Sequence, residues 1–119
     1  MEIEREMMRG AGPVAVLKLL ERGEMYGYEL VQALTGRTDG VLAMGQSTLY
    51  PMLYNLEAKG HVTSREKTAE SGRVRRYYSL TAKGKRRLAE DTAQWKALVK
   101  AMTKLGVTGP AAGTSAAGA

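Results

Sequence analysis

The sequence contains no cysteine and no phenylalanine, and it has one histidine and three prolines in 119 residues. The absence of cysteine excludes disulfide bonds, thiolate metal sites and cysteine nucleophiles, and it fits a reducing cytoplasm. A Ser-His-Asp arrangement would have to use His61, which follows a helix stop and opens a strand, so we expect this histidine to be structural or solvated. A phosphate-binding loop and a metal-spaced cluster are also missing. The sequence therefore predicts a protein that is not an enzyme and that binds no metal and no cofactor.

Long hydrophobic runs are also missing. No apolar stretch approaches the roughly 18 to 20 residues of a membrane span, and the acidic start MEIERE does not resemble a signal peptide. We therefore expect a cytoplasmic chain without a membrane segment. Its length suits one domain with appendages, and its formal net charge of +6 favours an anionic partner such as nucleic acid.

The most informative stretch is an amphipathic helix predicted over residues 46–59. Leu49, Met52, Leu53 and Leu56 follow the i, i+3, i+4, i+7 spacing of a buried face, and Gly60 ends the helix. Because Pro51 disfavours a helix interior, the helix either starts near Ser47 or Thr48 or bends at the proline, and Gly45, Ser47 and Thr48 can each cap it. The residues outside the apolar stripe that can contact a partner are Gln46, Ser47, Thr48, Tyr50, Tyr54 and Asn55.

Shorter helices are predicted ahead of this stretch. Residues 1–9 form a short amphipathic helix that Gly10, Gly12 and Pro13 interrupt, and a second helix runs from Pro13 to a stop at Gly23. A third segment, 24–34, carries a buried stripe, and Val41, Leu42 and Met44 fold back on the core. Two short helices followed by a connected third match a helix-turn-helix arrangement.

A β-hairpin is predicted from two strand-like segments, 61–67 and 73–80, joined by turn residues 68–72. Five positive charges gather near its distal end and should repel one another unless an anion lies between them. They are Arg65, Lys67, Arg73, Arg75 and Arg76. A phosphate backbone is the natural partner, and a solvated basic surface that keeps the protein soluble is the alternative.

The last predicted helix covers residues 81–105 and begins at the capping residue Thr81. At 1.5 Å per residue it would be about 35 Å long, too long for a domain of this size to cover. Apolar residues recur along it every seven positions, as in a coiled-coil-like dimer contact. The dimer-interface residues predicted from this repeat are Leu88, Trp95, Leu98, Met102 and Leu105. Residues 106–119 lack periodicity and charge, so we predict a disordered tail.

The fold predicted from this order is mainly α with a small β-hairpin (α+β). It is a winged helix-turn-helix domain at 13–80, with a recognition helix at 46–59 and a wing at 61–80, followed by the dimerisation helix. Three motifs together resemble the PadR family of bacterial transcriptional regulators. They are Tyr26-Gly27-Tyr28-Glu29-Leu30, the run from Ser47 to Leu53 with Leu56-Glu57 and Gly60, and the run from Gly72-Arg73 through Tyr77-Tyr78 to Gly84.

The resemblance implies a homodimer, like the small PadR subgroup with one C-terminal helix, that binds double-stranded DNA. We expect two recognition helices to enter successive major grooves of a palindromic operator, as in a repressor. The predicted DNA contacts are the helix residues Gln46, Ser47, Thr48, Tyr50, Tyr54 and Asn55, the five wing cations, Tyr77 and Tyr26. Tyr28 and Tyr78 are expected to be structural. The alternative is a winged-helix protein-interaction module without sequence-specific DNA binding.

The resemblance also implies a response to a small hydrophobic or aromatic effector. Two copies of Trp95, meeting across the dimer, could hold a flat hydrophobic compound. The alternative role for Trp95 is that of a plain residue of the dimer core.

Overall fold

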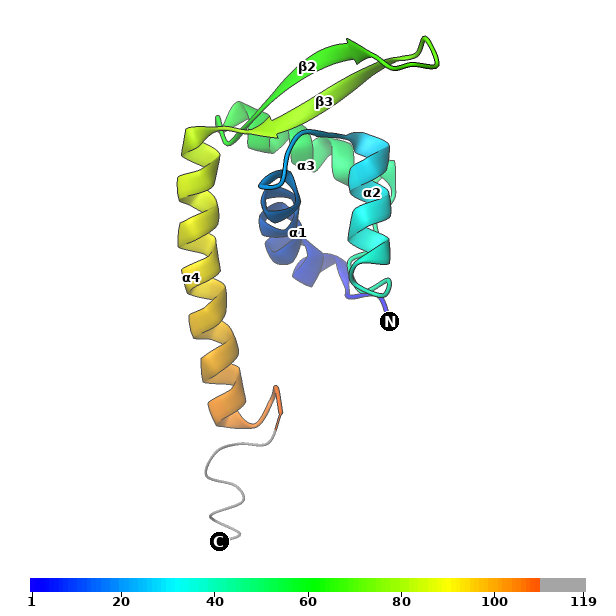
Figure 1. Ribbon diagram of the computed structural model, residues 1–119. Helices are drawn as coiled ribbons and strands as arrows, with labels where there is room; N and C mark the ends of the chain where they lie inside the picture. The colour runs from blue at the N-terminus through cyan, green and yellow to red at the C-terminus, as the bar shows by residue number, and fades with distance from the viewer. Residues whose placement is uncertain (110–119) are drawn as a thin grey trace, which may run out of the picture. The chain divides into compact units, whose positions relative to one another are not determined.

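The computed structural model describes residues 1–109 of the chain (Figure 1). Its elements in order are α1 (Arg5–Leu20), β1 (Met25–Tyr26), α2 (Gly27–Gly36), α3 (Gln46–Ala58), β2 (Val62–Thr68), β3 (Val74–Leu80) and α4 (Ala82–Leu105). The predicted α+β fold class is confirmed. The described chain divides after Leu88 into two compact units. Within residues 1–109, no helix combines the length and hydropathy of a membrane span.

The first helix differs from the prediction. We expected a break at Gly10, Gly12 and Pro13, but α1 continues through all three residues. A Cβ on Gly12 would lie 3.0 Å from the Met52 sulfur of α3, so the glycine lets the two helices approach closely. Buried side chains on both sides of the proline, Met8 and Val16, hold the helix against the core. Tertiary packing therefore outweighs the poor helix propensity of this segment.

The sheet has three antiparallel strands in the order β1-β3-β2. The predicted hairpin is confirmed, with β2 and β3 paired from Val62↔Leu80 to Thr68↔Val74. The third strand, β1, was not predicted, and it pairs Met25 with Tyr78 and Tyr26 with Tyr77. Glu29 accepts a hydrogen bond from the Tyr26 backbone N–H at 3.1 Å, and this bond helps to end the strand where α2 begins.

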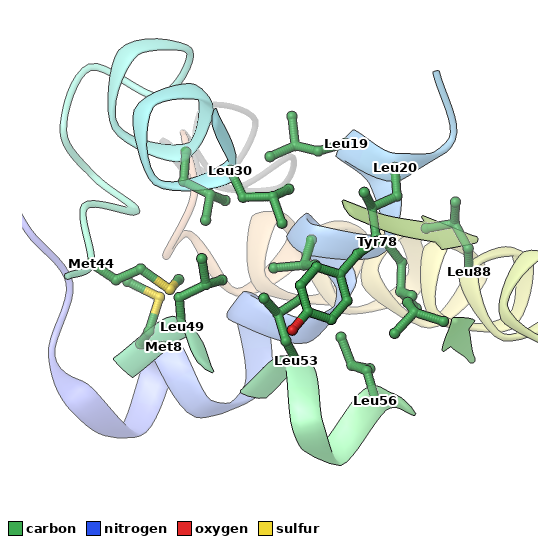
Figure 2. Packing of buried hydrophobic residues seen from close by; sticks show 14 residues of the cluster. Met8, Leu19, Leu20, Leu30, Met44, Leu49, Leu53, Leu56, Tyr78 and Leu88 are labelled. Atoms are coloured by element: carbon green, nitrogen blue, oxygen red, sulfur yellow. The ribbon is translucent and has the colours of Figure 1, made fainter. Parts of the chain in front are cut away.

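The core of the first unit is formed by side chains from α1, α2, α3 and the sheet. Leu17 of α1, Leu30 of α2 and Leu49 of α3 are fully buried with Tyr78 of β3. Figure 2 shows Met8 and Met44 at one end of this cluster and Leu88 of α4 at the other. The expected return of the loop before α3 to the core is confirmed at Met44, which is buried.

The ends of α3 and α4 follow the predicted chemistry. Of the three alternative caps of α3, Gly45 is the residue used, and Pro51 lies inside the helix. Gly60 follows at a φ of 78°, as expected for a helix stop. Thr81 caps α4, since its Oγ1 accepts the Gly84 N–H at 2.9 Å and donates to the Gly60 carbonyl at 2.6 Å.

The predicted disordered tail, 106–119, lies mostly outside the described residues. Its first residues instead close α4. The Gly106 N–H donates to the Thr103 carbonyl at 3.0 Å, and the Val107 N–H donates to the Met102 carbonyl at 2.8 Å. With Gly106 at a φ of 87°, these bonds form a C-terminal helix cap.

Candidate nucleic-acid interface

Helix α3, the predicted recognition helix, turns one face away from the core. Leu49, Leu53 and Leu56 are buried, and the residues on the opposite side are exposed. The exposed residues are Gln46, Ser47, Thr48, Pro51, Tyr54, Asn55 and Ala58. Hydroxyl and amide groups on this face can donate to and accept from base edges or phosphates. Small side chains at Ser47 and Ala58 leave room for a close approach. The side chains of this face have the chemistry of a surface that can bind nucleic acid.

Tyr50 does not belong to the exposed face, although we predicted a contact role for it. It is half-buried, and a Cβ on Gly27 of α2 would collide with its ring, with Cζ at 2.8 Å. Its ring also stacks on that of Tyr54, with centroids 6.2 Å apart and an interplanar angle of 30°. Tyr50 therefore supports Tyr54 and joins α3 to the start of α2.

One face of the wing connects to α3. Arg76 of β3 donates to the Ser64 hydroxyl at 3.1 Å, and Ser64 donates to the Glu57 carboxylate of α3 at 2.7 Å. Arg76 also pairs with Glu66 across the hairpin at 3.1 Å. This chain of polar contacts fixes one wing cation beside α3.

The other wing face carries alternating cations and aromatic rings. Lys67 lies 4.7 Å from the centroid of the Tyr77 ring, and Arg75 lies 4.3 Å from that of Tyr26. The two tyrosine rings meet edge to face at 5.4 Å. Because Tyr26 comes from β1, these contacts tie the outer strand to the hairpin.

Glu24 adds a carboxylate to this second face. It accepts two hydrogen bonds from Arg65 at 3.1 Å each and one from Lys67 at 2.6 Å. Hydrogen bonds from Arg65, which has the larger effect, and from Lys67 lower the pKa of the Glu24 carboxyl to about 2. We missed this contact because the residues are 41 and 43 positions apart. Recognising β1 as a strand beside β3 could have revealed it.

The predicted repulsion among five wing cations is therefore wrong in part. Glu24 and Glu66 are ion-paired with Arg65, Lys67 and Arg76. Arg75 lies over an aromatic ring, and Arg73 is exposed near the hairpin turn. Within residues 1–109, neither Arg73 nor Arg75 has a carboxylate partner. The unneutralised charge lies close to the tip of the wing.

Comparison with known proteins decides the family. Residues 16–90 match the transcriptional regulator PadR-like family. The chain belongs to this family. A transcriptional regulator from Mycobacterium tuberculosis is 36% identical over 87 residues, which cover 73% of this chain and 78% of the relative.

Solved structures agree with this assignment. A PadR family transcriptional regulator from Eggerthella lenta has a TM-score of 0.73 at 36% identity, over 84% of this chain and 85% of the other. A transcriptional regulator from Clostridium thermocellum has a TM-score of 0.76 at 28% identity, over 83% of this chain and 96% of the other. These relatives are regulators rather than enzymes, and PadR regulators bind DNA and are typically dimeric.

Two tyrosines of the PadR motifs behave differently from each other. Tyr78 is 0% exposed, as predicted for a structural residue, and burial raises the pKa of its hydroxyl. Within the described residues this hydroxyl has no hydrogen-bond partner. Tyr28, also predicted to be structural, is 49% exposed and accepts a hydrogen bond from Gln32 at 2.7 Å. Tyr28 therefore lies at the surface of this PadR-like protein.

The predicted dimer residues of α4 fall into two groups. Leu88 is only 4% exposed and belongs to the core of its own protomer, so its assignment to the dimer interface is wrong. In the second unit, Trp95, Leu98 and Leu105 are 36%, 45% and 76% exposed. Met102 is partly buried. The seven-residue repeat therefore begins as core and continues as an exposed apolar stripe.

No described residues form a candidate metal site. Within residues 1–109, no three His, Cys, Asp or Glu side chains are grouped closely enough to hold an ion. His61, the single histidine, is buried, and its carbonyl accepts the Thr81 N–H at 3.1 Å.

Proposed function

We propose that this protein is a homodimeric repressor that binds a palindromic operator. The observation that carries the proposal is the exposed polar face of α3 beside a basic wing. In this arrangement α3 lies in the major groove, where Gln46, Ser47, Thr48 and Asn55 contact base edges or the adjacent phosphates. Gln46 and Asn55 have the amide groups that pair with adenine.

The wing supplies affinity more than sequence preference. Arg73 and Arg75 near its tip contact the phosphate backbone, and Arg76 acts from its position beside α3. Arg65 and Lys67 join them when a phosphate competes with Glu24 for their charges. Tyr54, supported by Tyr50, reaches a phosphate next to the recognition helix, and Tyr26 and Tyr77 hold the wing cations in place.

Dimerisation sets the spacing of the two recognition helices. The apolar stripe of the second unit, formed by Trp95, Leu98, Met102 and Leu105, packs against its copy around a twofold axis. Half-sites about 34 to 36 Å apart then match one turn of B-DNA.

An effector acts through Trp95 in this proposal. The indole is partly exposed, so two copies of it across a twofold axis can hold a flat hydrophobic compound that favours release of the operator. Titration with planar aromatic compounds should then quench the tryptophan fluorescence in a saturable way. A linear, unsaturable change would leave Trp95 with a structural role only.

Binding of the purified protein to its own upstream DNA tests the proposed function. Affinity is measured against a scrambled duplex of equal length at several salt concentrations. We expect protection of one palindromic site and a specific affinity at least about 10³-fold above that for the scrambled duplex. Equal, steeply salt-dependent binding to both duplexes would mean non-specific binding. No binding to either duplex would favour the protein-interaction module.

A further inference from the structure

A hollow separates the start of α1 from α3. It has a volume of about 590 Å³, and its lining includes Arg5 and Arg9 of α1 together with Thr48, Pro51 and Asn55 of α3. The three α3 residues belong to the exposed face of the recognition helix. Two arginines that no sequence motif singled out therefore lie beside the proposed groove-binding surface.

Helix geometry explains why these arginines face α3. Arg5 and Arg9 are four residues apart, and the same stripe of α1 continues to Gly12 and Val16, both of which are buried. The two guanidinium groups thus occupy positions of the inward-facing stripe just beyond the end of the core. Both residues are exposed, and within residues 1–109 neither has a carboxylate partner.

The two arginines lie beside the flank of α3 that faces away from the wing. Tyr54 and Glu57 mark the wing flank, because Glu57 accepts from Ser64 of β2. Thr48 and Asn55, seven residues apart, mark the other flank, which borders the hollow. A helix in the major groove, about 12 Å wide, has a phosphate backbone on each side. In the proposed function the wing cations face one of these backbones.

We propose that Arg5 and Arg9 bind the phosphates of the other backbone, so that α3 is held from both sides of the groove. This inference rests on the proposed function. Glu2 also lines the hollow and opposes the binding of an anion there. The local net charge from these three side chains is still positive, and long arginine side chains can reach a phosphate at the rim.

Replacement of both arginines by alanine tests the inference. Arg5→Ala/Arg9→Ala should weaken binding to the operator and to a scrambled duplex by the same factor, at least about tenfold near 0.15 M salt. The slope of log K against log salt should fall by about 1.8 per protomer, because two phosphate contacts are lost. Arg5→Lys/Arg9→Lys should retain most of the affinity, and Glu2→Gln should raise it.

A matched control removes two arginines elsewhere. Arg22 and Arg37 line a different hollow, between α1 and α2, whose lining includes no residue of α3. Arg22→Ala/Arg37→Ala loses the same charge and should keep the wild-type salt slope apart from a small long-range effect. Circular dichroism checks that each variant retains its helices.

Two outcomes separate the inference from the proposed function. If the wild-type chain binds its operator and the Arg5→Ala/Arg9→Ala variant has the same affinity and slope as the control, the inference is overturned and the proposed function stands. If the wild-type chain binds no duplex at all, the proposed function fails and the inference fails with it.

Discussion

At the scale of single residues, Gly84 makes the tightest approach to another segment among the glycines of residues 1–109. It is buried near the start of α4, and a Cβ there would collide with the carbonyl oxygen of His61. The obstructing atom belongs to the backbone, so a rotamer change cannot relieve the clash. The glycine therefore allows α4 to leave the sheet directly beside Gly60 and His61.

Gly84→Ala should lower the free energy of unfolding by about 1 to 3 kcal/mol because of this clash. Gly10→Ala is the matched control, since Gly10 lies inside α1 and no neighbouring atom comes within 4 Å of the position that its Cβ would take. That change should raise stability by about 0.5 to 1 kcal/mol. Urea unfolding followed by circular dichroism measures both. Equal effects of the two substitutions would mean that Gly84 does not make the close approach described.

The ion-paired carboxyl group of Glu24 should make the free energy of unfolding depend on pH. Its pKa falls from 4.5 to about 2 because Arg65 and Lys67 donate to the carboxylate, so the ionised group favours the folded state. This contribution is complete above the unfolded pKa near 4.5 and is lost as the pH falls toward 2. The free energy of unfolding of wild type and Glu24→Gln is measured by urea unfolding, each relative to its own value at about pH 7. Between pH 5 and pH 2 it should fall less in Glu24→Gln than in the wild type, because the variant lacks the ionised carboxylate that is lost there.

The same substitution should strengthen DNA binding. Without Glu24, Arg65 and Lys67 lose their carboxylate partner, so affinity for the operator and for a scrambled duplex should rise together, with a steeper salt slope. Glu21→Gln is the control, because Glu21 pairs with Lys18 on α1 at 2.7 Å and lies outside the wing. A rise of the same size in both variants would point to net charge alone.

At the scale of elements, α3 and α1 show what the sequence could and could not predict. The spacing of Leu49, Leu53 and Leu56 correctly predicted α3, because burial of one face decides a helix of this length. For α1, propensity predicted a break that tertiary packing removes, since Met52 of α3 fills the space over Gly12. The sequence around Gly12 alone does not show that Met52 of α3 packs against it.

Contacts between distant elements limited the prediction of the site. The polar face of α3 could be predicted because its residues share one helix. The pairing of Glu24 with the wing depends on β1, a strand of two residues that is too short for a periodic signal. The pairing of the wing cations with Glu24 and Glu66 was not predicted.

The proline inside α3 provides a prediction for a whole element. Pro51 is exposed and leaves the Ser47 carbonyl without its helical N–H partner. Pro51→Ala restores this donor and should raise the free energy of unfolding by about 1 kcal/mol or more. Thr48→Ala, on the same exposed face, should change stability by less than about 0.5 kcal/mol. Urea unfolding compares the two, and a destabilised Pro51→Ala variant would contradict the expectation.

At the scale of the whole molecule, the chain consists of a core unit and a second unit built on the rest of α4. The exposed residues Trp95, Leu98 and Val99 lie on one stripe of that helix, and Ala97 and Lys100 lie on the opposite side. A stripe of large apolar residues on an otherwise charged helix is typical of an interface with another chain. The proposed homodimer would cover this stripe.

Leu98→Glu should therefore convert the protein to a monomer, because the introduced carboxylate would lie in an apolar contact. Ala97→Glu adds the same charge at the neighbouring, exposed position and should leave the dimer intact. Analytical ultracentrifugation gives the mass of each variant. A monomer contacts one half-site only, so operator affinity should fall by at least about 100-fold for Leu98→Glu and stay near wild type for Ala97→Glu. A wild-type chain that sediments as a monomer, or a dimeric Leu98→Glu variant, would place the interface elsewhere.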